Sequence, residues 1–176
     1  MAAWYLEIPF GKGKHALSIV PEGTTQGHFL SKYILRGRSI HVSTTGADRL
    51  KMERVVVVLL AGMVAQRRYR PSSVRSWHGS GDFSSAVNLM SYFAGNDRET
   101  AAYLKLLMIR AELTLERPGS WECVDALAAA LLDRKILSAK EAVETIQATH
   151  AQILEEHYKS RGLSLPWEQP AQVDPA

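Results

Sequence analysis

Short apolar segments separated by turn residues make up the first part of the chain. Residues 15–20 and residues 27–35 have the length and the apolar, β-branched content that are typical of strands. The first of them ends at Pro21-Glu22-Gly23, a sequence that favours a turn. A short alternation of apolar and polar residues follows over residues 40–42. These segments predict a small antiparallel sheet, preceded by a short helical segment over residues 2–6.

The longest apolar pattern runs from Asp48 to Gln66 and predicts a helix. This stretch exceeds the length of a typical strand, although its valines favour one. The charged residues at its start fit a helix that enters the core from a solvated end. We expect it to be the central buried helix, with a smooth face that lets a second helix approach closely at Ala61, Gly62 and Ala65.

The second half of the chain has the caps and apolar stripes of consecutive helices. We expect helices over residues 82–93, from Asn96 to Pro118, from Ser120 onward and from Ser138 to about Lys159. Asn96 with Glu99, and Ser138 with Glu141, have the spacing of capping boxes. The helical period predicts the core faces of the second and third of these helices: Leu104, Leu107, Met108, Ala111 and Leu115, then Trp121, Val124, Ala128 and Leu131.

The predicted fold class is therefore α+β, with a small N-terminal antiparallel sheet followed by a predominantly helical bundle. The chain has 176 residues, of which 46% are apolar and 22% charged, and this fits one globular domain with a sizeable core. We expect that domain to span residues 1–160. Residues 161–176 contain Pro166, Pro170 and Pro175, which predict a tail without fixed structure.

Cysteine content and hydropathy indicate the cellular compartment in which we expect the protein. The single cysteine, Cys123, excludes an internal disulfide framework and favours a reducing compartment. Its position on an apolar stripe predicts a buried small side chain. The first ten residues lack a secretory signal. The longest apolar run, Val55 to Ala65, is shorter than the about 20 residues that cross a bilayer. We expect a cytoplasmic protein with no membrane partner.

The basic charge of the chain has a structural interpretation. The net charge is +3, and some of it lies at Arg67, Arg68, Arg70 and Arg75. Nucleic-acid binding would need interleaved aromatic residues or a recognition helix, and neither accompanies this cluster. Cations near the C-terminus of a helix are stabilising in any case. We therefore expect no nucleic-acid partner.

Four stretches carry a likeness to a known family. They are Ala16 to Gly23 with Gly27-His28-Phe29 after it, the apolar helix Val58 to Gln66, the segment Gly79-Ser-Gly-Asp-Phe-Ser-Ser-Ala86, and residues 126–144. In this order and spacing they resemble the peptidase domain of the FtsH family of ATP-dependent zinc metallopeptidases. The last stretch is similar to the closing helical hairpin of that domain.

The resemblance implies a zinc peptidase that acts on unfolded polypeptide. Family members bind Zn²⁺ through two histidines of an HExxH helix and a downstream aspartate, and the Glu between the histidines activates the metal-bound water. By the resemblance Asp82 is the third ligand, while Gly27, His28 and Phe29 form an edge strand that pairs with extended substrate. From the residues alone, the N-cap is the favoured interpretation of Asp82, and the resemblance makes the two interpretations even. The strand is equally a covered edge.

The sequence departs from the family at its catalytic centre. It contains no HExxH motif, Gln66 replaces the family's glutamate, and no GxxxxGKS/T motif of an ATPase is present. Either the start was assigned too late, which the abrupt edge of the likeness at Met1 favours, or the motif has been lost. As written, we expect the domain to cleave nothing and to bind Zn²⁺ only if the missing histidines are supplied. The alternative is a non-catalytic peptide-binding or assembly module, with a homo-oligomer or a separate ATPase as further partners.

Overall fold

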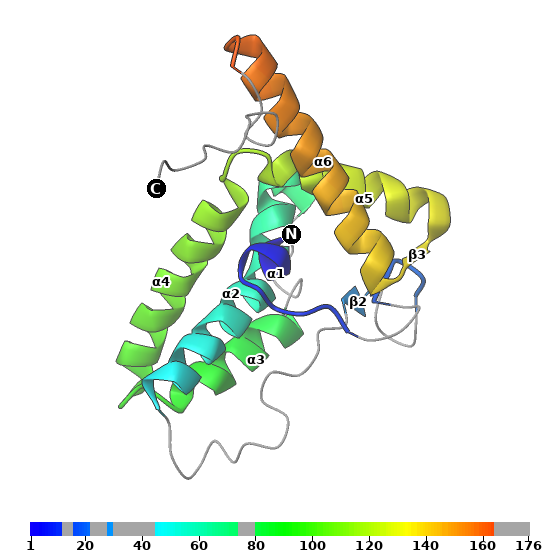
Figure 1. Cartoon of the computed structure of the whole chain (residues 1–176). Coiled ribbons are helices and arrows are strands. Elements are labelled where there is room, and N and C mark those ends of the chain that lie inside the picture. Colours follow the sequence, from blue (N-terminus) through cyan, green and yellow to red (C-terminus); the bar gives the residue numbers. More distant parts are fainter. Residues whose placement is uncertain (12–15, 22–27, 30–44, 74–79, 164–176) are drawn as a thin grey trace, which may run out of the picture.

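The molecule is mostly helical, with one small sheet (Figure 1). The computed structural model describes residues 1–11, 16–21, 28–29, 45–73 and 80–163. One group of helices consists of α2 (Gly46–Tyr69), α3 (Ser80–Ser91) and α4 (Asp97–Leu115), with a 3₁₀ turn, η1, at Pro71–Ser73. A second group consists of α5 (Ser120–Arg134), α6 (Ala139–Ser160) and the sheet. The predicted α+β class is confirmed in this mostly helical form.

The first core lies between α2, α3 and α4. Helix α2 packs against both other helices, and its buried residues include Met52, Val56 and Leu60. Helix α4 contributes Leu107 and Ala111, which are fully buried. The central position predicted for α2 is confirmed. The close approach predicted at Gly62 is wrong, because a Cβ on this exposed residue would meet no atom within 4 Å.

The second core lies between α5 and α6. Cys123 and Leu127 of α5 meet Ala142 and Ile146 of α6, with Leu137 between the two helices in sequence. The predicted burial of Cys123 is confirmed, and its thiol lies 3.8 Å from the Ile146 carbonyl oxygen. The inward face of α5 differs from the predicted one. Ala128 is exposed, and Trp121, Val124 and Leu131 are only half-buried.

The sheet has three antiparallel strands in the order β2-β1-β3, namely β2 (His28–Phe29), β1 (Leu17–Ser18) and β3 (Ile136–Leu137). Leu17 pairs with Phe29 on one side and with Leu137 on the other. Both predicted N-terminal strands are thus present, although shorter in the described residues than expected. The third strand was not predicted, because it comes from the connection between α5 and α6. The alternation over residues 40–42 lies outside the described residues.

Helix α1 (Ala2–Tyr5) joins the two cores. Ala2 and Leu6 pack against the first core, Trp4 and Phe10 pack against the second, and Met1 packs against both. The short N-terminal helix predicted from the sequence is confirmed. Its position explains how two helical groups with separate cores form one molecule.

The predicted caps are confirmed in part. The Asn96 side chain accepts the Glu99 N–H at 2.9 Å, but the Glu99 carboxylate accepts the Gly95 N–H rather than that of Asn96. Ser120 is the first helical residue of α5, and its hydroxyl donates to the Thr114 carbonyl oxygen at 3.0 Å.

None of the helices in the described ranges is long and apolar enough to cross a membrane.

Candidate functional site

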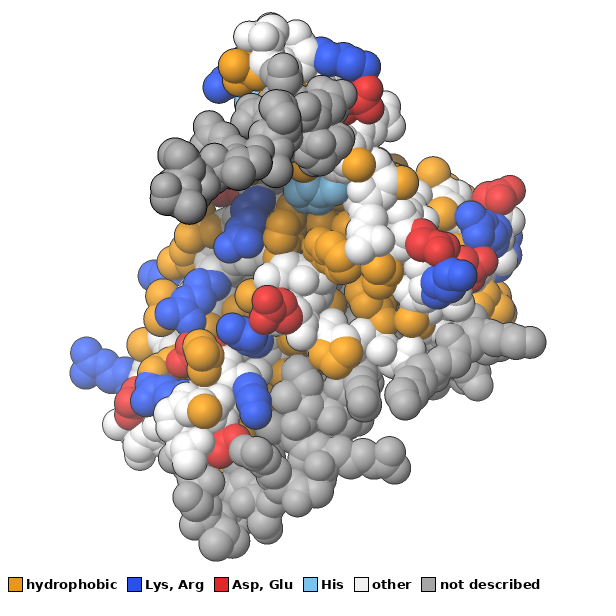
Figure 2. Space-filling model, viewed as in Figure 1, with side chains coloured by type: hydrophobic (Ala, Val, Ile, Leu, Met, Phe, Trp, Pro, Cys, Tyr) orange, Lys and Arg blue, Asp and Glu red, His pale blue; other side chains and the backbone are white. Residues whose placement is uncertain are grey.

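An open groove of about 720 Å³ lies between the N-terminal segment and the start of α6. Figure 2 shows hydrophobic side chains gathered between α1 and α6. One wall consists of α1 and the chain that follows it, and the other is the first turn of α6. The lining residues are Trp4, Tyr5, Glu7, Ile8, Pro9 and Phe10 from the first wall and Ala139, Lys140 and Val143 from the second.

The first wall is shaped by the way α1 ends. The Ile8 N–H donates to the Ala3 carbonyl oxygen at 2.9 Å, and the Glu7 N–H donates to the Trp4 carbonyl oxygen at 3.1 Å. This pair of bonds is the Schellman motif, and it requires a left-handed residue that here is Glu7, with φ 56°. The turn buries Ile8 and directs the chain through Pro9 along the groove.

The second wall is held by the capping box predicted from the sequence, which is confirmed. The Glu141 N–H donates to the Ser138 hydroxyl at 3.2 Å, and the Ser138 N–H donates to the Glu141 carboxylate at 2.8 Å. Hydrogen bonds from Ser138, and then the bond from Arg134, lower the pKa of Glu141 below its ordinary value. The box fixes the first turn of α6, so that Ala139 and Val143 line the groove while Ala142 faces the core.

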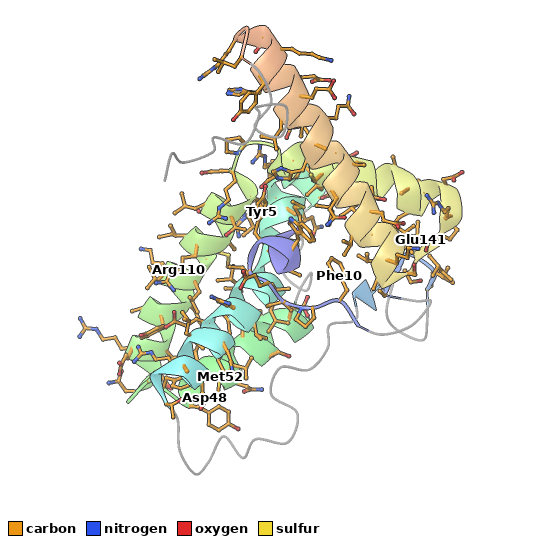
Figure 3. The ribbon with its side chains drawn as sticks, viewed as in Figure 1. Tyr5, Phe10, Asp48, Met52, Arg110 and Glu141 are labelled. Atoms are coloured by element: carbon orange, nitrogen blue, oxygen red, sulfur yellow. The ribbon has the colours of Figure 1, made fainter. Side chains whose placement is uncertain are left out.

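The groove and the sheet both border the second core. Trp4 and Phe10 line the groove and also pack on the second core. Leu17 of β1 packs on that core as well. In Figure 3, Phe10 lies at the end of the N-terminal segment that is nearest the sheet. Within the described residues β2 pairs with β1 alone, so it is an edge strand. His28 and Phe29 therefore occupy the edge position that the sequence predicted, while Gly27 lies outside the described residues.

A hydrogen bond of 2.8 Å between the Tyr5 hydroxyl and His150 Nε2 ties α1 to α6. The Arg117 guanidinium lies over the Tyr5 ring, 5.1 Å from its centre. His150 is half-buried in this contact. The sequence analysis did not identify the residues that line the groove. The cluster of Trp4, Tyr5 and Phe10 near the N-terminus was the available signal.

Asp82 lies apart from this groove, in the first turn of α3. The N-cap interpretation is wrong, because α3 already begins at Ser80. The Asp82 side chain is exposed, yet the atoms packed around its carboxyl group limit hydration and raise its pKa. In the parts of the chain that the structure describes, no three His, Cys, Asp or Glu residues gather as metal ligands.

A second, smaller groove of about 280 Å³ lies between α1, α2 and α4 and is lined by three arginines. Each of them already has a partner. Arg54 lies 3.6 Å from Glu7, Arg110 lies 2.7 Å from Glu53, and Arg117 covers Tyr5. At the end of α2, Arg68 donates to the Leu115 carbonyl oxygen and stacks on Trp121. These cations hold helices together.

Comparison with known proteins gives no relative. No family model matches the chain, and no curated protein or solved structure matches it.

Proposed function

We propose that this domain binds unfolded polypeptide in the groove between α1 and α6, on a zinc-metallopeptidase-like scaffold that resembles the FtsH peptidase but carries out no cleavage with the residues present. The observation that supports this proposal is the apolar lining of a groove with a volume of about 720 Å³. That volume is within the range of ligand sites, and it accommodates several side chains of an extended segment.

The charges at the groove favour a polypeptide over an anionic ligand. Glu7 lies on one wall and Lys140 on the other, so the charged lining residues carry one charge of each sign. A polyanion such as a nucleic acid would need an excess of cations. An exposed apolar stretch of an unfolded chain needs only the hydrophobic walls, because burial of its side chains supplies the free energy.

The edge strand offers a second point of attachment. An extended segment can add to a sheet edge through backbone hydrogen bonds, which bind with little sequence preference. Among the residues that the structure describes, His28 and Phe29 of β2 occupy such an edge. Phe10 and Leu17, which pack on the same core, connect this edge to the groove. A segment that enters the groove with its side chains and pairs with β2 through its backbone would use both features.

Fluorescence anisotropy with a labelled, unstructured polypeptide rich in Leu and Phe tests this proposal. Val143→Glu places a charge in the groove, and we expect it to weaken binding by roughly tenfold or more, because a buried unpaired charge costs more than about 1.4 kcal/mol. Gln147→Glu adds the same charge one turn further along α6, at an exposed position outside the groove, and should leave the affinity unchanged. Absence of binding, or equal affinity of both variants, would refute the proposal.

Zinc content and hydrolysis separate this function from the peptidase hypothesis. Asp82 is the one predicted zinc ligand in this sequence, and the HExxH histidines are absent from it. We expect the purified chain to bind the polypeptide, to contain no stoichiometric zinc and to leave the polypeptide intact. Stoichiometric zinc together with hydrolysis that is lost in Asp82→Asn would instead establish the peptidase.

A further inference from the structure

Helix α4 has a second apolar face that the fold leaves exposed. Its inner face, which includes Leu104, Leu107 and Ala111, is buried against the bundle. On the outer face Leu106, Ile109 and Leu113 are 45%, 44% and 58% exposed. These residues, together with the exposed Ala102, are spaced by four, three and four positions. We call these four residues the outer stripe. Figure 2 shows hydrophobic side chains between lysines and arginines along α4.

The spacing of the outer stripe is that of a coiled-coil seam. Alternating steps of three and four keep side chains on one narrow face, which packs against a partner helix. Flanking the stripe on one side are Lys105 and Glu112, seven residues apart and of opposite charge. Neither forms an ion pair with another residue in the described part of the chain. Both charges are thus available to a partner.

The stripe is complementary to a second copy of itself in the antiparallel direction. If a two-fold axis crosses α4 near Leu107 and Met108, Leu106 meets Ile109 of the second copy, and Ala102 meets Leu113, a small residue against a large one. In the same register Lys105 of each copy faces Glu112 of the other, because positions on the same flank of an antiparallel seam face each other. One register therefore satisfies both the apolar layers and the charges.

We propose that two copies of this chain associate through the outer stripes of their α4 helices, in an antiparallel, two-fold symmetric pair. The next layer would bring Glu99 against Glu116, which limits the seam to the four apolar layers. Glu99 already accepts the Gly95 N–H at the start of α4. An interface of this size is expected to be weak, with a dissociation constant on the order of micromolar. The pairing involves none of the residues that line the groove between α1 and α6, so it stands independently of polypeptide binding.

Sedimentation velocity over a concentration series tests this pairing by charge reversal. Lys105→Glu places like charges opposite each other twice per dimer, as does Glu112→Lys. Each should raise the dimer dissociation constant by roughly tenfold. The double variant Lys105→Glu/Glu112→Lys restores opposite charges, and its dissociation constant should return to that of the unaltered chain. Thermal melts of the dilute proteins establish that each variant is folded.

Two separate Leu→Glu variants, one in the outer stripe and one outside it, provide a second test. Leu106→Glu places a charge in the seam and should abolish dimers, whereas Leu132→Glu on α5, at a residue 66% exposed, should leave them intact. The proposal is overturned if the unaltered chain stays monomeric up to roughly millimolar concentration. It is also overturned if the double charge reversal fails to restore the dimer, or if Leu132→Glu disrupts the dimer as strongly as Leu106→Glu does.

Discussion

The same substitution is expected to have different costs in stability at two neighbouring leucines of α4. Leu107 is fully buried between α2 and α4, whereas its neighbour Leu106 is 45% exposed. Replacing either residue by alanine changes helix propensity equally, so any difference in unfolding free energy reports burial. The two variants therefore measure how sharply the two faces of α4 differ.

The expected magnitudes follow from the exposures. Leu107→Ala removes a fully buried side chain and leaves a cavity, which costs about 3 kcal/mol and up to about 5 kcal/mol. Leu106→Ala leaves no enclosed cavity and loses about half of a burial term of about 2 kcal/mol, so its cost is about 1 kcal/mol. A difference of about 2 kcal/mol is a large share of the stability of a domain of this size.

Urea unfolding monitored by circular dichroism measures both costs. The protein must be dilute, below the concentration at which copies of α4 associate, because dimer formation would add to the apparent stability. A smaller midpoint shift for Leu106→Ala at an unchanged slope is the expected result. Equal losses in both variants would refute the assignment of inner and outer faces, and with it the basis for the paired α4 helices.

Four further predictions concern a glycine within α2, the turn before α5 and the capping box of α6. Gly62→Ala should stabilise the fold by roughly 0.5–1 kcal/mol, because the exposed position has room for a Cβ and lies within α2. Gly119→Ala should destabilise it by about 1–2 kcal/mol, because φ is +79° and the new Cβ would lie 3.2 Å from Ile153; thermal melts compare the two. Ser138→Ala should cost about 1 kcal/mol in urea unfolding, because α6 loses its cap. Glu141 has a lowered pKa, so its stabilisation is present above the ordinary value of 4.5 and is lost as the pH falls through its lower folded pKa. The unaltered chain should therefore exceed Glu141→Gln in stability at pH 7 and lose that advantage as the pH falls below 4.5, and a constant difference would contradict this.

Local signals predicted the helices of the second half well. Periodic apolar residues located the core face of α4, where Leu104, Leu107 and Ala111 are buried as expected. The capping box of Ser138 and Glu141 could be predicted from the sequence because the two residues are three positions apart. Helix α5 was harder, because alanines on several faces blur the period. Cys123 and Leu127 face the core instead of Ala128.

Tertiary pairings were beyond the reach of local patterns. Strand β3 consists of only Ile136 and Leu137 between two helices, and it forms because β1 lies beside it. The groove likewise brings together Phe10 and Val143, which are far apart in the sequence. The Tyr5–His150 hydrogen bond is another long-range contact. Residues that are far apart in the sequence can be recognised as one site only from the folded structure.

Hydrogen–deuterium exchange in the presence of a saturating unstructured polypeptide tests the central claim most directly. If the groove between α1 and α6 binds the polypeptide, amide exchange should slow in the segments 4–10 and 139–143, which form its two walls. Exchange in β2 should slow with them, while α3 around Asp82 should be unchanged. Protection confined to α3, or no protection in either wall, would contradict the account.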